Sequence, residues 1–140
     1  MQATRIIAIR HGETAWNVDT RLQGHLDIAL NHKGIWQAGQ VAHALADEDI
    51  DAIYASDLLR AWQTANAVAH TTAAPLTANV GLRERGFGSF QGKTYAEIEL
   101  QWPEESQRWR KRDPDWAPPG GESLRVMRDR VQSTVNALAQ

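Results

Sequence analysis

The chain starts with a short, continuous run of apolar residues that ends abruptly in polar ones. Residues 5–10 are rich in isoleucine and show no alternation of apolar and polar positions. A parallel strand that is covered on both faces has this pattern, because neither face meets water. The pattern therefore predicts a buried parallel strand at 5–10, followed directly by polar side chains.

The next stretch is predicted to contain a helix, a strand and a second helix. Residues 32–46 carry apolar side chains at helical spacing, and Asn31 can cap their start. Residues 51–56 form a second predicted strand. Its last residue, Ser56, is expected to cap a helix from about 57 to 69.

The second half of the chain is predicted to be mainly helical. Thr94 and Glu97 have the spacing of a capping box, so a helix starts there and ends near Pro103. Residues 113–121 are rich in proline and glycine and indicate a rigid loop. The last segment, 122–139, is amphipathic and predicts a further helix.

A third strand at 76–83 completes the alternation of strands and helices. Crossovers between parallel strands place helices on the faces of the sheet. We therefore expect an α/β fold, a three-layer α/β/α sandwich with a mostly parallel central sheet. The length of 140 residues is that of one domain, so residues 1–140 are expected to form a single domain.

Composition acts mainly by exclusion. Fifteen Lys and Arg against seventeen Asp and Glu give a formal charge of −2, which excludes a generally basic nucleic-acid binder. The chain has no cysteine, which excludes a disulfide framework, a thiolate nucleophile and a cysteine-based zinc site. We expect a cytoplasmic protein. No apolar run is long enough to cross a bilayer, so we expect no membrane partner.

Polar side chains follow each predicted strand, where the carboxyl ends of parallel strands meet at one edge of the sheet. The first strand leads to Arg10 and His11, the second to Arg60 and the third to Glu84. One guanidinium group can donate two parallel hydrogen bonds to two phosphate oxygens, and a helix N-terminus adds positive partial charge. These residues together predict a site for a phosphoryl dianion.

The same residues suggest how that group could react. Histidine has an ordinary pKa of about 6.5, so His11 can offer a free ring nitrogen as a nucleophile near neutral pH. Glu84 can protonate the leaving oxygen if its carboxyl group is buried, because burial favours the neutral form. The alternative for Glu84 is a salt bridge with its neighbours Arg83 or Arg85.

Several motifs, in the right order over nearly the whole chain, resemble the histidine phosphatase superfamily. This group includes the cofactor-dependent phosphoglycerate mutases. The motifs are RHGET at 10–14, WN at 16–17, RLQGHLDIALNHKG at 21–34, YASDLLRAWQTA at 54–65, LRERGFGSFQGKT at 82–94 and PPGGES at 118–123. The resemblance implies the phosphoglycerate mutase-like α/β fold.

The resemblance also implies a role for each matching residue. The implied residues are the nucleophile His11, the phosphate-binding Arg10 and Arg60, the proton donor Glu84, and the phosphate-contacting Asn17 and Gln23. Hydrogen bonding within the loop is the alternative for the last two. The resemblance implies no metal and no other cofactor, because the arginines supply the charge stabilisation. Trp16, beside the pocket, is expected to touch substrate.

One departure from the family concerns its second histidine, which follows a later strand and completes the phosphate pocket. The remaining histidines all precede the PPGGES turn and are expected at the surface or at helix caps; they are His25, His32, His43 and His70. We therefore expect the chain to be the front part of a longer protein. Without the missing strand, the edge at 5–10 is exposed, and we expect self-association or a homodimer through it.

The path from the glutamate motif to the PPGGES turn is compact, which is more similar to the family's phosphatases than to its mutases. We expect a phosphomonoester hydrolase that acts on a small phosphorylated metabolite through phosphohistidine. A phosphoglycerate mutase remains an alternative, as does an inactive phosphate-binding or interaction module. The basic run RWRKR at 108–112 is expected on a solvated helix face, where it could attract an anionic substrate.

Overall fold

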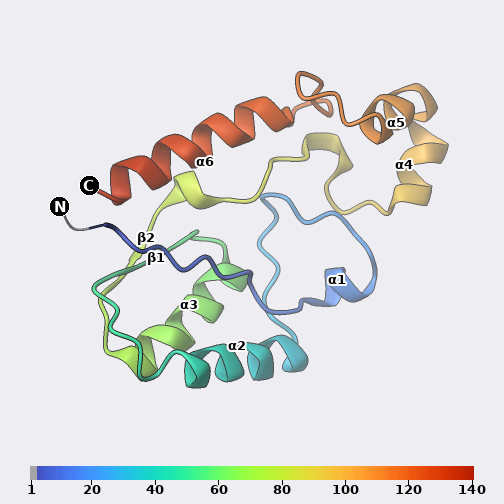
Figure 1. Cartoon of the computed structure of the whole chain (residues 1–140). Coiled ribbons are helices and arrows are strands. Elements are labelled where there is room, and N and C mark those ends of the chain that lie inside the picture. Colours follow the sequence, from blue (N-terminus) through green and yellow to red (C-terminus); the bar gives the residue numbers. More distant parts are fainter. Residues whose placement is uncertain (1–2) are drawn as a thin grey trace.

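The computed structural model describes residues 3–140, and its order of elements is that of an α/β protein (Figure 1). The elements are α1 (Ala15–Val18), α2 (His32–Ala44), β1 (Ile53–Ala55), α3 (Leu59–Thr72), β2 (Leu76–Ala78), the 3-10 turns η1 (Val80–Leu82) and η2 (Gly88–Phe90), α4 (Tyr95–Gln101), α5 (Pro103–Arg110) and α6 (Leu124–Leu138).

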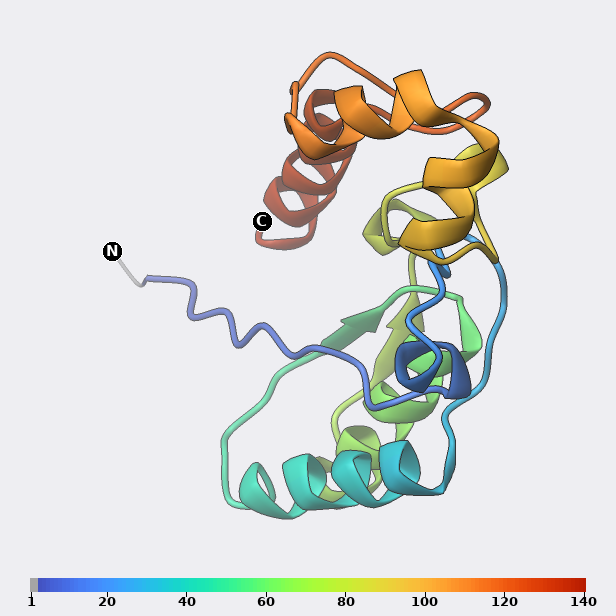
Figure 2. The same ribbon diagram turned by 90° about the vertical axis from the view of Figure 1, so that its right-hand side faces the viewer.

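The two strands form a small parallel sheet, in which Ile53 lies opposite Leu76 and Ala55 opposite Ala78. Helix α3 connects them and packs against both, and α2 packs on α3. Figures 1 and 2 both show α2 and α3 on one side of the strands and α6 on the other. The predicted α/β class is confirmed, although each strand is shorter than its predicted run.

The prediction of a buried strand at 5–10 is wrong for this structure. The segment is extended, but it forms no ladder with β1 or β2, and Ile6, Ile7 and Ile9 are all exposed. A strand exists only where a second backbone accepts and donates its hydrogen bonds. Within residues 3–140 no element provides that partner for 5–10. The apolar pattern therefore indicates a segment suited to burial, which these residues alone do not supply.

Local capping signals predicted several helix starts correctly. The Asn31 side chain accepts from the Gly34 N–H at 2.8 Å, and Thr94 and Glu97 form the predicted capping box. The predicted Ser56 cap is wrong: its hydroxyl accepts from Leu58 N–H, and α3 starts at Leu59. The Leu59 N–H instead donates to Asp27, a residue 32 positions earlier that no local pattern reveals.

Two buried clusters hold the fold together. Between α2 and α3 lie the small side chains Ala38, Ala42 and Val68. Under α4 and α5, Phe90 is fully buried, with its ring 5.2–6.0 Å from Trp102, Trp109 and Trp116. Such aromatic pairs stabilise beyond the area that they bury. Arg85 and Phe87, which follow Glu84, pack against Trp109 of this second cluster.

The last helix is confirmed, but it packs only partly. The start of α6 is capped by Ser123, whose hydroxyl accepts from Val126 N–H, and none of its residues is fully buried. Its apolar side forms a shallow groove lined by Met127, Val131 and Val135. Within residues 3–140, no helix has the length and apolar character needed to cross a membrane.

Candidate active site

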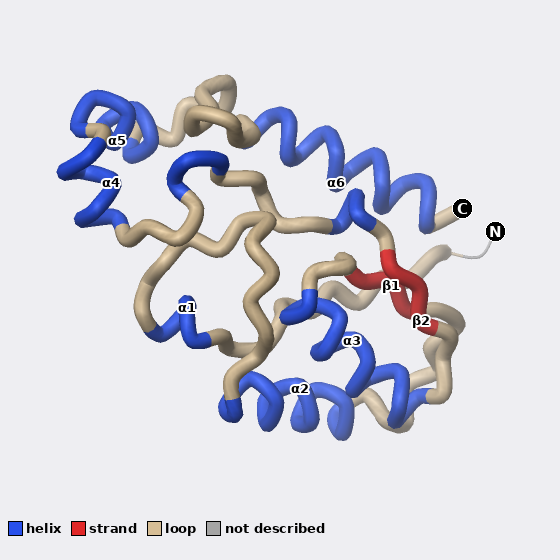
Figure 3. The backbone as a smooth tube through the Cα atoms, turned by 180° about the vertical axis from the view of Figure 1, so that it is seen from behind, coloured by secondary structure: helices blue, strands red, loops and turns tan. Residues whose placement is uncertain are grey.

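Loops carry much of the candidate site: residues 3–13 and 83–87 belong to no helix or strand, and Figure 3 draws such backbone in tan. His11 lies at the end of the N-terminal segment and is partly buried. The N–H of Gly12 donates to the Thr64 hydroxyl at 3.0 Å, and that hydroxyl donates to the carbonyl of Arg60 at 2.8 Å. One threonine of α3 therefore ties the residue after His11 to the turn that carries Arg60.

A close contact between two backbones fixes the same segment from the other side. A Cβ atom on Gly12 would lie 2.5 Å from the carbonyl oxygen of Gly34, and a Cβ on Gly34 would clash with Glu13. The Glu13 N–H also donates to Gln37 of α2 at 2.9 Å. Helix α2 thus holds residues 12–13 directly, with both glycines required by the close approach.

Arg60 is 2% exposed and points into the loop 24–26. Its guanidinium donates to the carbonyls of Leu26 at 2.8 Å and Gly24 at 2.6 Å. Burial lowers the pKa of Arg60 from its usual value, while the carboxylates of Glu84 and Asp27 raise it. The group still stays protonated near neutral pH, because arginine starts from a very high value. It therefore provides a fixed positive charge.

The electrostatic surroundings favour a neutral His11. Burial lowers the pKa of His11 below its ordinary 6.5, and the positive charges of Arg60 and Arg10 lower it further. The Gly12 carbonyl and the Glu84 carboxylate act in the opposite direction. Nδ1 lies 2.6 Å from the Gly12 carbonyl oxygen, so the proton of the neutral ring belongs on Nδ1. This tautomer leaves the lone pair of Nε2 available.

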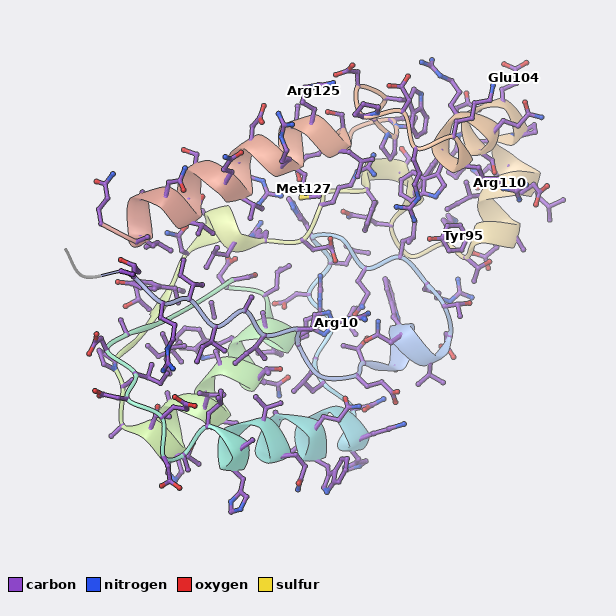
Figure 4. The ribbon with its side chains drawn as sticks, viewed as in Figure 1. Arg10, Tyr95, Glu104, Arg110, Arg125 and Met127 are labelled. Atoms are coloured by element: carbon purple, nitrogen blue, oxygen red, sulfur yellow. The ribbon has the colours of Figure 1, made fainter. Side chains whose placement is uncertain are left out.

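Arg10 and Glu84 stand at the solvent side of this arrangement. Arg10 is exposed at the centre of Figure 4, and its side chain has no hydrogen-bond partner within residues 3–140. Glu84 is exposed too, so the burial invoked for it from the sequence is not seen. Its carboxylate accepts from the Arg85 N–H at 2.8 Å and acts electrostatically on His11 and Arg60. The structure therefore brings His11, Arg10, Arg60 and Glu84 together.

The two arginines beside Glu84 have other partners. Arg83 forms a two-pronged ion pair with Asp57 at 2.6 and 2.7 Å. Arg85 is buried, donates to the Glu122 carbonyl at 2.8 Å and stacks over Trp109 at 4.9 Å. Neither side chain pairs with Glu84, so the salt-bridge alternative is not what the structure shows.

Asn17 and Gln23 both contact Thr14 through their amide oxygens. The Asn17 oxygen accepts from the Thr14 N–H at 2.9 Å, as half of a capping box on α1. The Gln23 oxygen accepts from the Thr14 hydroxyl at 2.7 Å. Within residues 3–140 neither amide nitrogen has a hydrogen-bond partner, and amide nitrogens are the donors that a phosphate would need. Both residues thus have a structural contact and a donor to spare.

The structure adds three residues beside Glu84 that the sequence did not single out, namely His25, Arg130 and Glu122. His25, expected at the surface, has its Nε2 2.8 Å from the carbonyl oxygen of Glu84. Arg130 of α6 donates to the same carbonyl at 3.2 Å and pairs with Glu122. His25 and Glu122 lie within two quoted motifs, but the contacts join residues dozens of positions apart. Trp16 packs against Gly92 and is not among the residues that line the pocket beside Glu84.

A pocket of about 450 Å³ extends from Glu84 toward α4, α5 and α6. Its walls combine aromatic and arginine side chains, and Figure 4 labels three of the lining residues, Tyr95, Arg110 and Met127. Arg108 and Arg112 of the basic run also line it, with Trp109 between them in sequence. The run therefore borders a pocket as well as solvent. Within residues 3–140, no cluster of His, Cys, Asp and Glu has an arrangement that could hold a metal ion.

Comparison with known proteins points to one family. A family model described as the histidine phosphatase superfamily (branch 1) matches residues 6–140. Glucosyl-3-phosphoglycerate phosphatase of Mycobacterium tuberculosis is 40% identical over 123 residues, which cover 88% of this chain and 55% of that protein. Metal-independent phosphoserine phosphatase of Arabidopsis thaliana is 37% identical over 142 residues, covering 99% of this chain and 60% of that protein.

Solved structures agree with the sequence comparison. The native structure of a mycobacterial glucosyl-3-phosphoglycerate phosphatase has a TM-score of 0.83 and 38% identity, covering 91% of this chain and 60% of that one. The chain thus spans between about half and two thirds of the length of these relatives.

Proposed function

Because the chain belongs to the histidine phosphatase superfamily, we propose that it hydrolyses phosphomonoesters through a phosphohistidine intermediate on His11. The observation that carries this proposal is the convergence of a neutral imidazole, a buried arginine and a carboxylate from three separate segments. We propose for His11, Arg10, Arg60 and Glu84 the roles that the sequence predicts. The names of two relatives, both phosphatases of small phosphorylated metabolites, support hydrolysis.

In the first step, Nε2 of His11 attacks the phosphorus atom and the ester bond to the alcohol oxygen breaks. The proton of the Glu84 carboxyl group passes to that oxygen, so a neutral alcohol leaves. Arg60 and Arg10 offset the charge that gathers on the phosphoryl oxygens. A bound dianion also favours the protonated form of a neighbouring carboxyl group, because like charges repel.

In the second step, water attacks the phosphohistidine. Glu84, now a carboxylate, takes one proton from that water, and the bond between Nε2 and phosphorus breaks. Inorganic phosphate leaves, and His11 and Glu84 return to their starting forms. Asn17 and Gln23 are proposed to donate their amide N–H groups to the phosphoryl oxygens in both steps.

The pocket beside Glu84 gives room for the alcohol part of the substrate. A leaving oxygen protonated by Glu84 would place its carbon skeleton against Tyr95 and Trp109, with Arg108 and Arg112 at the border. We therefore propose a small phosphorylated metabolite whose alcohol part is polar or anionic. The run 108–112, expected on a solvated helix face where it could attract an anionic substrate, borders this pocket, which supports the proposal.

The alternative, a phosphoglycerate mutase, would return the phosphoryl group to an alcohol instead of water. Its use of His11 is identical, and the relatives described above favour hydrolysis. Release of inorganic phosphate in a one-to-one ratio with alcohol separates the two activities.

His11→Ala provides the central test, because a covalent role cannot be taken over by a methyl group. The wild-type chain, incubated with a radiolabelled phosphomonoester, should carry acid-labile, base-stable phosphate on His11, and the variant should carry none while unfolding at a similar temperature. His43→Ala, on the outer face of α2, is the matched control and should retain the label. Label on another residue of the wild type would refute the proposal.

We also propose that the protein acts in the cytoplasm, which its lack of cysteine supports. Self-association through residues 5–10 is proposed as well, because Ile6, Ile7 and Ile9 present an exposed apolar edge. Residues 1–140 are proposed to act as one domain, and the family match spans 6–140 without division.

A further inference from the structure

The segment that carries Glu84 has little secondary structure of its own. It follows the 3-10 turn η1, and residues 83–87 belong to no helix or strand. Three carbonyl oxygens, one in η1 and two in this segment, nevertheless converge on one side chain: Arg130 of α6 donates to Gly81 and Arg83 at 2.9 Å each and to Glu84 at 3.2 Å. A single guanidinium therefore fixes this stretch of backbone, as its fork of five rigid N–H donors allows.

Arg130 is itself held in one orientation by Glu122. Two bonds of 2.9 and 2.8 Å join the guanidinium to the two carboxylate oxygens, and both side chains are largely shielded from solvent. The same carboxylate accepts from the Gly86 N–H at 2.8 Å. The Arg130 hydrogen bonds lower the pKa of Glu122, so the pair stays ionised in neutral solution. The pair thus holds the backbone before and after Glu84.

His25 connects the backbone held by this pair to the loop 24–26. Its Nε2 lies 2.8 Å from the Glu84 carbonyl oxygen, and the preceding residue, Gly24, accepts from the guanidinium of Arg60 at 2.6 Å. The contact requires a proton on Nε2, since the carbonyl oxygen only accepts. The loop that orients Arg60 and the segment that carries Glu84 are therefore joined at one backbone carbonyl.

We propose that the Glu122–Arg130 pair, together with His25, is the positioning device of the proton donor: it sets the place of Glu84 relative to His11 and Arg60. The inference rests on the proposed function of Glu84. Arg130 and Glu122 contact the backbone of Glu84 and of the residues on either side of it, not its carboxylate, so they act through that residue. Misplacement of a catalytic group by about 1 Å can cost about 10²-fold in rate.

The first test compares two substrates that differ in their need for a proton. Arg130→Lys keeps the charge but loses the fork, so kcat for an alkyl phosphate such as glycerol phosphate should fall roughly tenfold or more. For para-nitrophenyl phosphate, whose leaving oxygen barely needs a proton, kcat should stay within about threefold. Glu122→Gln should behave in the same way. Arg128→Lys on the same helix, where Arg128 pairs with its exposed neighbour Asp129, is the matched control and should change neither rate.

A double variant separates positioning from general support of the fold. In the Glu84→Gln background, Arg130→Lys should produce no further change in the ratio of alkyl to aryl rates, because the proton donor is already gone. An equal loss for both esters in Arg130→Lys, or a further change of the ratio in the double variant, would overturn the inference.

The proposed function and this inference can fail separately. If the wild type hydrolyses neither ester, the proposed function fails, and the positioning is then decided by amide NMR. Hydrogen exchange at Gly86 and the amide shift of Arg85 should change in Arg130→Lys but not in Arg128→Lys. Unchanged exchange and shifts would overturn the positioning whatever the activity.

Discussion

The two sides of the candidate site are built in different ways. One side, here called the anchored side, consists of Arg60 and Glu84 with the loop 24–26 and the segment 81–86 that hold them. Carbonyl groups, a buried guanidinium and an ion pair tie these parts together. The other, N-terminal side consists of Arg10 and His11 after the extended residues 3–9. Its apolar side chains are exposed, and no strand within 3–140 pairs with it.

The difference shows which contacts hold the charged groups of such a site in place. Charges that are fixed before substrate arrives stabilise a transition state without reorganisation at the moment of reaction. The anchored side meets that condition through its hydrogen bonds. The N-terminal side is held mainly downstream of His11, where Gly12 contacts Thr64 and Gly34. Upstream, Thr4 and Arg5 make exposed side-chain hydrogen bonds to Ala139 and Glu48. Substitutions should therefore act mainly on chemistry at the anchored side and mainly on association upstream of His11.

At the anchored side, the largest effect should come from Glu84→Gln. The variant should slow an alkyl phosphate by about 10²-fold or more, the usual contribution of a positioned general acid, while an aryl phosphate changes far less. Steady-state kinetics on both esters measures this, with Glu104→Gln on the exposed start of α5 as the control. Equal losses for the two esters would give Glu84 a structural role.

Arg60→Lys should follow, with a loss of about 10²-fold in kcat/KM, because a lysine supplies a point charge instead of a fork. The variant also gives up a donor to the carbonyls of Gly24 and Leu26, so the free energy of unfolding should fall by about 1–3 kcal/mol. Arg125→Lys, at an exposed ion pair with Asp115, should change both quantities little. A change in kcat/KM within threefold would place Arg60 outside the site.

The pH dependence sharpens the comparison at His11. Since burial lowers the pKa of His11, its nucleophilic neutral form should persist below pH 6.5. The acid limb of kcat/KM should therefore lie below 6.5 and fall about tenfold per pH unit once the ring is protonated. An acid limb at or above 6.5 would contradict the electrostatic picture.

The same shift links folding to pH. The unfolded chain binds a proton at His11 more readily than the folded chain, so the contribution of His11 to stability is present above 6.5 and is lost as pH falls from there toward the folded pKa. Urea unfolding at several pH values should show this loss in the wild type and its absence in His11→Asn.

The smallest effect on stability should come from the N-terminal side. Ile7 is 42% exposed, so Ile7→Lys should change the free energy of unfolding by no more than about 0.5 kcal/mol. Ile98→Ala, at a position 1% exposed, should cost about 2–5 kcal/mol. Sedimentation should show weaker self-association in Ile7→Lys than in the wild type. Unchanged association would remove residues 5–10 from the interface.

The sequence predicted what depends on neighbouring residues. Asn31 with Gly34, and Thr94 with Glu97, lie within one helical turn of each other, so their caps could be found by spacing alone. The N–H of Leu59, the first residue of α3, is instead bonded by Asp27, which lies 32 positions earlier and cannot be found by local spacing. The isoleucine run at 5–10 indicates a segment suited to burial. Which backbone pairs with that segment depends on the whole fold and not on the local sequence.

The site was predicted in the same uneven way. His11, Arg60 and Glu84 follow predicted strands, and the sequence therefore predicted that they lie together. In the structure loops bring them together, since residues 5–10 form no strand. The order of the Glu84 segment depends on Arg130, one of fifteen basic residues, and no local pattern distinguishes it from the exposed Arg128 two positions earlier.

The contact between Gly12 and Gly34 has a consequence for laboratory evolution of this protein. Overcrowding at most buried positions can be relieved by trimming the neighbour to a smaller residue. Here the crowding atoms are backbone atoms, those of Gly34 around Gly12 and those of Glu13 around Gly34, so no side chain can be trimmed to make room. A library aimed at new substrates should leave both glycines untouched and place its diversity at Arg108, Arg110 and Arg112, which line the pocket.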